Sequence, residues 1–333
     1  MGILKLTSRS VLAALGVAML LSAAPANAKT YNLTLCGASP GGLWSLLGAG
    51  VDGAVKAAFP GSTVTYQTSG GGFANVALLG QKKCELGIVH DAEAILASKG
   101  EAPFKSPIKN LRMVSVLYTW APMQVLVNKD FAEKHNLKSL ADIAAKKIPA
   151  RILVNRRGIV ASPIAVDLLT EMGASPDNLK SWGGSITYSA SKEQGELMRD
   201  RRADMIVNSL FVNHRSIQQL AKAIDLTILP LTGPAVDKVV KKWKIGKYTI
   251  PASAYAFADK DIKTITLSAQ LYALDSADST MIGDVSKALI DHADKVQGVH
   301  KAMKPFSAKI AGSGEAIAYH PAAEASFKKA GIR

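Results

Sequence analysis

The sequence has few cysteines and no apolar stretch long enough to cross a membrane in the usual way. Its 333 residues include only two Cys, too few for a disulfide framework or a cysteine-rich metal site. No run of 18 apolar residues occurs, which argues against an ordinary membrane-spanning helix. The six histidines lack the paired spacing of a zinc site, and no phosphate-binding P-loop sequence is present. We therefore expect no metal and no cofactor.

Acidic residues are outnumbered by basic ones. The chain has 26 Asp and Glu against 40 Lys and Arg, a formal net charge of +14. Such an excess is typical of proteins that bind nucleic acid, membrane surfaces or acidic ligands. No block of five or more like charges occurs, however, and the densest basic stretch, residues 238–247, is interrupted by apolar residues. A scattered basic surface explains most of this charge, and we expect no nucleic-acid partner.

The N-terminus has the pattern of an export signal. Lys5 and Arg9 precede an apolar stretch over residues 11–24, and the Ala-Asn-Ala sequence ending at residue 28 matches a cleavage site. This pattern predicts a cleavable secretory signal peptide over residues 1–28 and therefore a periplasmic protein. An uncleaved membrane anchor is the alternative. The mature chain would keep a net charge of +12.

Strand and helix patterns alternate along the rest of the chain in two units. In the first unit, strands are expected at 31–36, 63–67, 86–90 and 111–118, with helices at 43–59, 73–80 and 91–98. In the second, strands are expected at 124–127, 152–155, 186–188 and 205–208, with helices at 140–145, 162–172 and 192–199. Residues 230–251 look loop-rich with one short helix, and a strand at 264–273 and a helix at 280–296 follow. Alternation of this kind indicates parallel sheets with helical crossovers.

The fold class predicted from this order is α/β, a two-lobe clamshell with a ligand cleft between the lobes. Each lobe is expected to be a mostly parallel sheet flanked by helices. Lobe I comprises residues 29–121 and 267–333, and lobe II comprises residues 122–266, joined near residues 119–122. A two-domain α/β enzyme is the alternative architecture, and the chemical motifs decide between them.

The best enzyme signal is a G-x-S-x-G sequence at Gly37–Gly41, which follows a strand and precedes a helix. The oxyanion hole of such an enzyme uses the backbone N–H of the residue after the serine. Here that residue is Pro40, which has no N–H. A G-x-G-x-x-G match at residues 48–53 lies inside the first helix and not at a strand-to-helix turn, where a dinucleotide site would need it. We therefore expect no catalytic residue.

The remaining polar candidates lie on strand-to-helix turns. Parallel strands end at one edge of a sheet, where ligands usually bind. Each turn also exposes a helix N-terminus with free N–H groups and a partial positive charge. Two such edges that face each other favour an anionic ligand. A glycine turn after a strand is equally often just a tight connection.

Several of these turns resemble one family of solute receptors. The segments Leu35–Trp44, Tyr66–Gly72 with Asn75, and Glu85–Asp91 are similar to those of the TAXI receptors of TRAP transporters. Further similar segments are 168–173, 202–206, 250–255 and 319–322, so that the resemblance extends over almost the whole mature chain. The resemblance implies a fold like that of type II periplasmic binding proteins. It also implies a small organic anion, such as glutamate, as ligand.

The sequence departs from the family pattern at three places. Cys36 stands where threonine is usual, and Trp44 where tyrosine is usual. In lobe II the usual Gly/Ser-rich turn is replaced by residues 155–162, which include Arg156 and Arg157. The fold implied by the resemblance is compatible with these changes, but the identity of the ligand does not transfer across them.

The resulting hypothesis is a monomeric periplasmic receptor that closes on its ligand and delivers it to TRAP permease subunits in the membrane. The ligand would be an amino acid or carboxylate, such as glutamate or a dicarboxylate. The alternatives are a receptor for an ABC importer or a sensor kinase, and a secreted serine hydrolase that uses Ser39. The candidate ligand-binding residues are Ser39, Trp44, Ser69, Asn75, Asp91, Arg156, Arg157, Ser162, Asn208 and Phe211.

Some of these residues have a second interpretation. Core packing explains an aromatic side chain as well as ligand contact does, above all for Trp120. Asp91 is also a good helix N-cap. One of Arg156 and Arg157 is expected to clamp a ligand carboxylate, since successive residues point in opposite directions. A solvated surface pair is the alternative.

Two further expectations concern charge and redox state. Lobe II carries a net charge of +8 and the mature part of lobe I +4, so that binding of an anion should weaken as salt rises. Cys36 and Cys84 are expected to be free thiols. If their strands are parallel neighbours, the two residues lie at opposite ends, too far apart for a disulfide.

Overall fold

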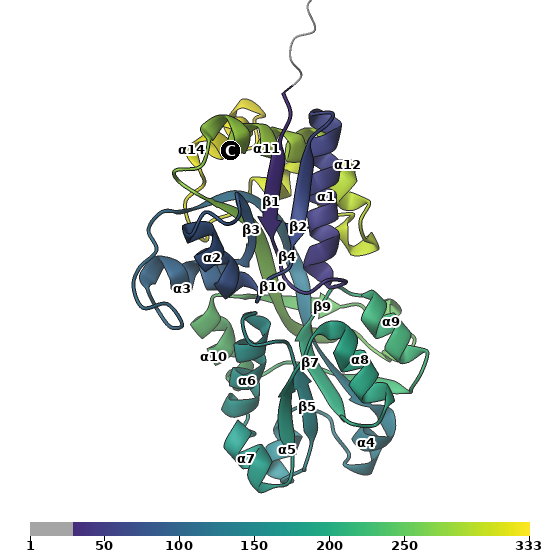
Figure 1. The fold of residues 1–333 in the computed structure, drawn as a ribbon. Coiled ribbons are helices and arrows are strands. Elements are labelled where there is room, and N and C mark those ends of the chain that lie inside the picture. Colours follow the sequence, from purple (N-terminus) through teal and green to yellow (C-terminus); the bar gives the residue numbers. More distant parts are fainter. Residues whose placement is uncertain (1–28) are drawn as a thin grey trace, which may run out of the picture.

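The computed structural model describes residues 29–333, and the predicted signal peptide lies outside the described residues. The chain forms two α/β units, one above the other in Figure 1, and two long strands run from one unit into the other. The first unit begins with β1 (Asn32–Cys36), α1 (Leu43–Ala58), β2 (Thr63–Gln67), α2 (Gly72–Gly80), β3 (Leu86–His90), α3 (Asp91–Lys99) and β4 (Leu111–Asn128).

The second unit follows β4, and three of its strands, β5, β6 and β7, are parallel to one another. It comprises α4 (Lys129–Lys134), α5 (Ala141–Ala145), β5 (Arg151–Val154), α6 (Ala161–Glu171), α7 (Pro176–Ser181), β6 (Ser185–Tyr188), α8 (Ser191–Arg199), β7 (Met205–Ser209), α9 (Arg215–Ala221), β8 (Leu226–Leu229), α10 (Pro234–Trp243), β9 (Gly246–Ile250) and η1 (Ala252–Ala254). The chain returns through β10 (Ile262–Leu274) to α11 (Ser279–Asp291), α12 (Ala293–Gln297), η2 (Lys301–Met303), α13 (Ala308–Ala311) and α14 (Pro321–Lys329).

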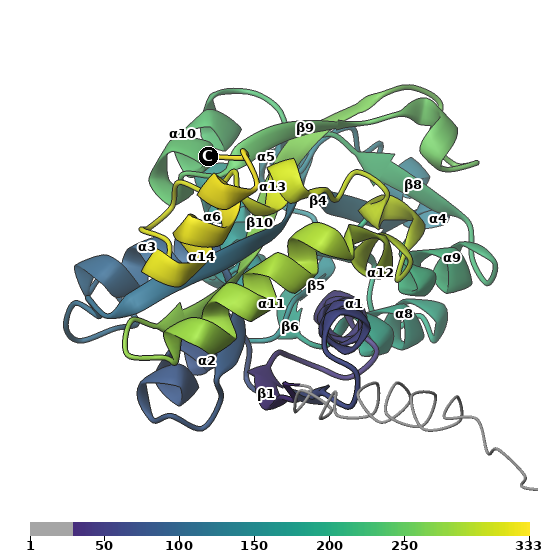
Figure 2. The same cartoon turned by 90° about the horizontal axis from the view of Figure 1, so that it is seen from above.

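The strands form one continuous order, β2-β1-β3-β10-β4-β7-β5-β6, with β8 beside β4 and β9 beside β10. The outer strands on each side are parallel: β1 pairs with β2 and β3, and β5 pairs with β6 and β7. The central strands β10 and β4 are antiparallel to their neighbours. Seen from above, α11, α13 and α14 lie against β4 (Figure 2). The predicted α/β clamshell is the fold that the chain adopts.

Strand β4 differs from the sequence-based expectation. Separate strands were expected at 111–118 and 124–127, whereas the structure has one strand of 18 residues. Pro122 lacks an N–H and lies in the middle of it, yet its carbonyl oxygen accepts a hydrogen bond from the N–H of Leu210. Side-chain pattern alone could not show that the backbone stays extended through residues 119–122. The two units are therefore joined by sheet and not by a loop.

Two other expectations also need correction. Residues 230–251 contain a strand, β9, in addition to the expected helix α10. Its residues are mostly exposed, so that no hydrophobic alternation revealed it. The helix expected over 280–296 is interrupted at His292, which separates α11 from α12.

The prediction of free thiols is wrong, because Cys36 and Cys84 form a disulfide with a Cα–Cα distance of 5.9 Å. β1 and β3 are parallel neighbours, but they are offset along their length. Leu35, near the end of β1, pairs with Leu86, the first residue of β3. The last residue of one strand therefore lies beside the segment that enters the other, and the two sulfur atoms meet there.

Candidate functional site

A cavity of about 60 Å³ lies where the two lobes meet at the carboxyl ends of their parallel strands. At about 10–15 Å³ for each water-sized position, it has room for only a few non-hydrogen atoms. Both lobes contribute to its wall. The lining residues are Ala38, Ser39, Pro40, Gly41, Gly42, Leu43, Trp44, His90 and Tyr118 from lobe I, and Asn155, Ile159, Ala161, Ala190, Ser191, Lys192, Ser209 and Leu210 from lobe II.

A larger hollow of about 1090 Å³ lies on the surface of lobe II, between α4, α9 and residues 254–259. All of its lining residues fall between residues 129 and 259. Closure of the lobes would therefore not change what this hollow contacts. The interlobe cavity is the better candidate site because its shape depends on both lobes.

Aromatic side chains form the lobe I wall of the cavity. Trp44 is only 5 % exposed, and its Nε1 donates a hydrogen bond to the Tyr118 hydroxyl at 3.1 Å. The Trp44 ring also packs on His90, with a centroid distance of 4.8 Å. Burial raises the pKa of the Tyr118 hydroxyl, so that the group stays protonated at neutral pH. The wall is thus apolar, with a hydroxyl and an imidazole at its edge.

Two helix N-termini open onto the cavity. α1 begins after Gly42 and α8 begins after Ala190, and neither helix has a side-chain cap. Both cap residues line the cavity. Free N–H groups at such ends attract anions. The Lys192 ammonium lies 3.9 Å from Glu196 on the exposed face of α8, so that the positive character of this wall comes from the backbone.

Ser39 and Trp44 line the cavity, whereas Ser69 and Asn75 lie behind its wall. The Ser69 hydroxyl lies 2.7 Å from the Gly37 carbonyl oxygen and 2.6 Å from Asn75 Oδ1. Asn75 Nδ2 donates to the carbonyl oxygens of Gly37 and Ile88. The two residues therefore fix the turn that carries Ser39.

Asp91 lies at the start of α3 beside β10. Its Oδ1 accepts a hydrogen bond from the N–H of Ala92 at 2.8 Å, and its Oδ2 accepts one from the Ser268 hydroxyl. Burial raises the pKa of Asp91, and the hydrogen bond from Ser268 opposes this effect. Asp91 thus holds β10 against α3, outside the cavity lining.

In lobe II, polar side chains form a buried network behind the cavity. Asn155 lines the cavity, and its Nδ2 donates to Asn208 Oδ1 at 3.0 Å. Asn208 Nδ2 in turn donates to Gln194 Oε1 on α8 at 2.9 Å. The Ser162 hydroxyl donates to the Ile159 carbonyl oxygen at 3.1 Å. Asn208 and Ser162 thus hold the ends of β7 and α6 in place.

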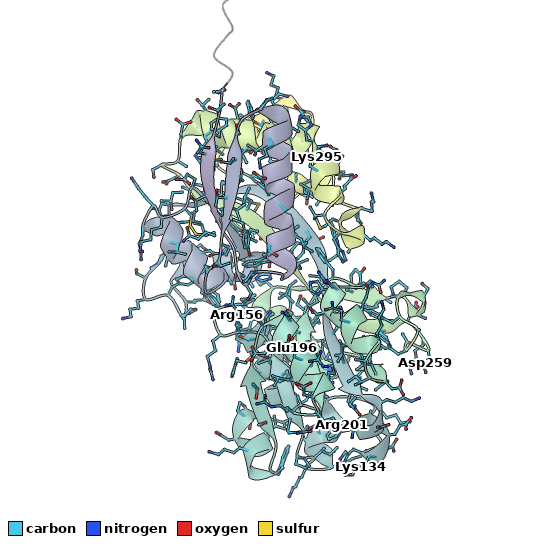
Figure 3. The ribbon with its side chains drawn as sticks, turned by 45° about the vertical axis from the view of Figure 1, so that its right-hand side comes forward. Lys134, Arg156, Glu196, Arg201, Asp259 and Lys295 are labelled. Carbon is cyan, nitrogen blue, oxygen red and sulfur yellow. A yellow bond between two sulfur atoms is a disulfide. The ribbon has the colours of Figure 1, made fainter. Side chains whose placement is uncertain are left out.

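The remaining predicted residues lie outside the cavity lining. Phe211 is fully buried and packs on Tyr118, with a centroid distance of 5.0 Å. The Arg157 guanidinium lies over the Tyr188 ring at 3.7 Å. Arg156 Nη2 donates to the Ser69 carbonyl oxygen at 3.2 Å, across the two lobes. Figure 3 shows Arg156 at the junction between the upper and lower units.

Sequence reasoning missed several cavity residues. Tyr118 has the pattern of a core strand residue, and Ser209 is the buried last residue of β7, so that neither gave a signal. His90, Asn155 and Ser191 lie on turns that the pattern did identify, and they could have been included on that ground. Within residues 29–333, no group of three His, Cys, Asp or Glu side chains is arranged to hold a metal ion. No helix in this range is long and apolar enough to span a bilayer.

Comparisons with known proteins agree with this architecture. The model of the NMT1-like family matches residues 35–331. Among solved structures, MatC from Rhodopseudomonas palustris with bound malate gives a TM-score of 0.56 at 12% identity, covering 84% of this chain and 93% of that chain. The periplasmic binding protein BugD gives a TM-score of 0.55 at 13% identity, with 90% and 93% covered.

A third structure is a binding protein component of an ABC phosphonate transporter from Pseudomonas aeruginosa, with a TM-score of 0.53 at 10% identity and 84% and 81% covered. Identities this low show a shared fold and no more. The chain belongs to the NMT1-like family, and its fold is that of the two-lobe periplasmic binding proteins.

Proposed function

We propose that this protein is a periplasmic solute receptor of a TRAP transporter, of the TAXI type, which captures a small organic anion. The observation that carries the proposal is the interlobe cavity onto which the uncapped N-termini of α1 and α8 open from opposite lobes. An anion held between them contacts both lobes at once. It therefore binds the closed form more tightly than the open one, and this difference in affinity is what drives closure.

The long strands supply the path for that closure. β4 and β10 pair with each other from Leu111 and Leu274 at one end to Pro122 and Thr266 at the other. β4 then continues into lobe II, where it pairs with β7 and β8. A rotation of lobe II about these strands changes the distance between the α1 and α8 N-termini.

The likeness to other binding proteins supports a carboxylate ligand. MatC was solved with malate, a small carboxylate. The N-terminal export pattern supports a periplasmic location, as does the likeness to the periplasmic protein BugD. The partners of this receptor would be membrane permease subunits that recognise the closed form and take up its ligand.

A receptor for an ABC importer is the second candidate, because one structure of this fold belongs to an ABC phosphonate transporter. A sensor kinase is a further candidate partner. Co-purification of the closed, ligand-loaded receptor with its membrane partner separates these candidates. A fused multi-spanning permease is expected for TRAP, and a partner with an ATPase subunit would overturn the TRAP assignment.

Two experiments test the receptor function itself. Mass spectrometry of ligand released from purified protein should reveal an organic acid, which calorimetry should then show to bind again. A serine-directed fluorophosphonate probe should leave Ser39 unlabelled, because Pro40 removes the oxyanion donor. Labelling of Ser39 would favour the hydrolase alternative.

A further inference from the structure

Glu93 is a fully buried side chain with no place in the function proposed above. It lies in the first turn of α3, and its Oε2 accepts hydrogen bonds from the N–H of its own helix cap, His90, at 2.9 Å. The His90 Nδ1 lies 3.3 Å from the same oxygen. Its other oxygen, Oε1, accepts a hydrogen bond from the N–H of Val160 at 2.7 Å. Glu93 thus joins lobe I to lobe II.

The partner of Glu93 in lobe II is the start of a helix. Val160 is the N-cap residue of α6, an 11-residue helix, and it has no side chain that can cap the helix. A negative charge at this position is favourable because the helix dipole is positive there. The Glu93 carboxylate therefore occupies the place that an anionic ligand group would take at α6.

The backbone around Glu93 leaves room for this carboxylate and for little else. A Cβ on Gly72 would lie 1.6 Å from Glu93 Oε2. Across the lobes, a Cβ on Gly71 would lie 2.4 Å from the Gly158 carbonyl oxygen, and one on Gly158 would lie 2.4 Å from the Gly70 carbonyl oxygen. We call this contact, made by Glu93, Gly70, Gly71 and Gly158, the clasp. These three glycines, together with Gly72, let the two backbones close on the Glu93 side chain.

The clasp lies directly behind the cavity wall. His90, Ile159 and Ala161 line the cavity. His90 contacts the Glu93 carboxylate directly, and Ile159 and Ala161 are the chain neighbours of Val160, whose N–H binds it. A ligand carboxylate at this end of the cavity would meet the Glu93 carboxylate, and like charges so close repel in a poorly solvated site. The N-termini of α1 and α8 also border the cavity and have no side-chain cap. α1 has no acidic residue in its first turn, and in α8 Glu193 is accompanied by Lys192, which lines the cavity.

We infer that Glu93 serves as the resident carboxylate of the closed cleft, so that the receptor takes compact acids with a single carboxylate and rejects dicarboxylates. This inference rests on the proposed receptor function and narrows its substrate class. The ligand carboxylate binds at α1 and α8, and the neutral end of the ligand faces His90. Because the clasp consists of contacts between protein groups alone, Glu93 also favours closure of the empty receptor.

The first test uses no ligand. Small-angle scattering should give a smaller radius of gyration for the unliganded parent than for Glu93→Ala, and formate at high concentration should restore the compact value in the variant. Glu93→Gln keeps an acceptor for the His90 N–H and should be intermediate. Glu101→Gln removes the same charge from an exposed ion pair with Lys99 and should behave as the parent. An unchanged radius in Glu93→Ala would overturn the clasp.

The second test compares acids of equal length by calorimetry: butyrate with succinate, and 3-hydroxybutyrate with malate. The parent should bind the monocarboxylate of each pair at least about tenfold more tightly, and Glu93→Ala should reduce this ratio by about tenfold. Tighter binding of the dicarboxylates by the parent, or a ratio unchanged in Glu93→Ala, would overturn the specificity. If the released native ligand is not an acid, the receptor proposal and the specificity fail together, while the scattering result still decides on the clasp.

Discussion

The two ends of the interlobe cleft differ in what satisfies their helix N-termini. At the clasp, the start of α6 is bound by the protein's own Glu93, and the backbones of the two lobes touch through glycines. At the cavity, the starts of α1 and α8 have no side-chain cap. The comparison teaches that closing the lobes and recognising the ligand can be separate tasks, carried by different ends of one cleft. Gly158→Ala at the clasp should then weaken binding by opposing closure, whereas substitutions in the cavity wall should weaken it by removing contacts with the ligand.

The largest expected effect comes from the disulfide beneath the cavity end. Cys36 ends β1 and directly precedes the turn that carries Ser39. The cross-link closes a loop with a sequence separation of 48 residues, for which loop entropy predicts about 4 kcal/mol of stability. The double variant Cys36→Ala, Cys84→Ala should lose stability of this order in urea unfolding. The double variant should also weaken ligand binding, while Glu93 stays buried in the clasp.

The parent in reductant serves as the control for this variant, and it should show the same loss. Mass analysis of the unreduced parent should show two hydrogens fewer than the reduced chain. An equal mass in both states, or equal stability of parent and double variant, would contradict the prediction.

Acid should loosen a third interlobe contact, between His214 and His300. Their rings lie 6.4 Å apart, and the N–H of Ser216 donates to His214 Nδ1 at 3.3 Å. Burial, aided by His300, lowers the pKa of His214 to about 4. The unfolded chain therefore takes up a proton near pH 6.5 that the folded chain refuses until about pH 4. About 3 kcal/mol of stability, present above pH 6.5, should be lost as pH falls across this window.

The variant His214→Asn keeps a cap acceptor and should flatten the stability profile between pH 6.5 and 4 in urea titrations. His135→Asn, at the end of α4, should leave the profile as in the parent. If His214→Asn remains as acid-sensitive as the parent, another group causes the loss.

A change at the cavity wall should reduce both stability and affinity. Trp44→Phe removes the donor to the buried Tyr118 hydroxyl, which should cost about 1–3 kcal/mol in unfolding free energy. Calorimetry should also show weaker binding of the released native ligand. Trp243→Phe is the matched control, since the Trp243 indole donates to Asp167 on lobe II, away from the cavity. Equal affinities of the two variants would place the ligand elsewhere.

A change at the clasp should have the smallest effect of these variants, and it should act mainly on ligand affinity. Gly158 has a φ of 108°, and an added Cβ would meet the Gly70 carbonyl oxygen. Gly158→Ala should therefore hold the lobes apart and weaken binding about tenfold, or about 1.4 kcal/mol. Gly183→Ala has a similar backbone cost at a φ of 87°, but its Cβ would lie 3.6 Å from Pro149 in ordinary contact. The Gly183 variant should lose stability alone, and equal affinities would argue against a clasp.

The alternation of strands and helices was enough to predict the α/β clamshell, because neighbouring parallel strands need a crossover connection, which is usually a helix. The continuity of β4 through Pro122 was beyond the pattern, since it depends on pairing with β10. The disulfide was mispredicted for a related reason: the offset between β1 and β3 is a property of register and not of sequence spacing.

Only part of the candidate site was predicted correctly, and the reason differs from that for the fold. Ser39 and Trp44 do line the cavity. Four other predicted residues instead form hydrogen bonds with backbone carbonyl groups or neighbouring side-chain amides: Ser69, Asn75, Ser162 and Asn208. A polar residue on a turn can do either, and the sequence does not distinguish the two. Whether any of them touches a ligand stays a prediction. Glu93 gave no signal because its partner, Val160, is 67 residues away.

The pair of long strands has a mechanical consequence. β4 and β10 run side by side between the lobes, and shifts in their register lie between Leu267 and Tyr272. Paired strands twist about their own axes, and irregular pairing of this kind lets the ribbon bend within this short segment. The lobes are therefore expected to move relative to each other mainly by rotation about these two strands. A membrane partner would then have a single angle by which to distinguish a loaded receptor from an empty one.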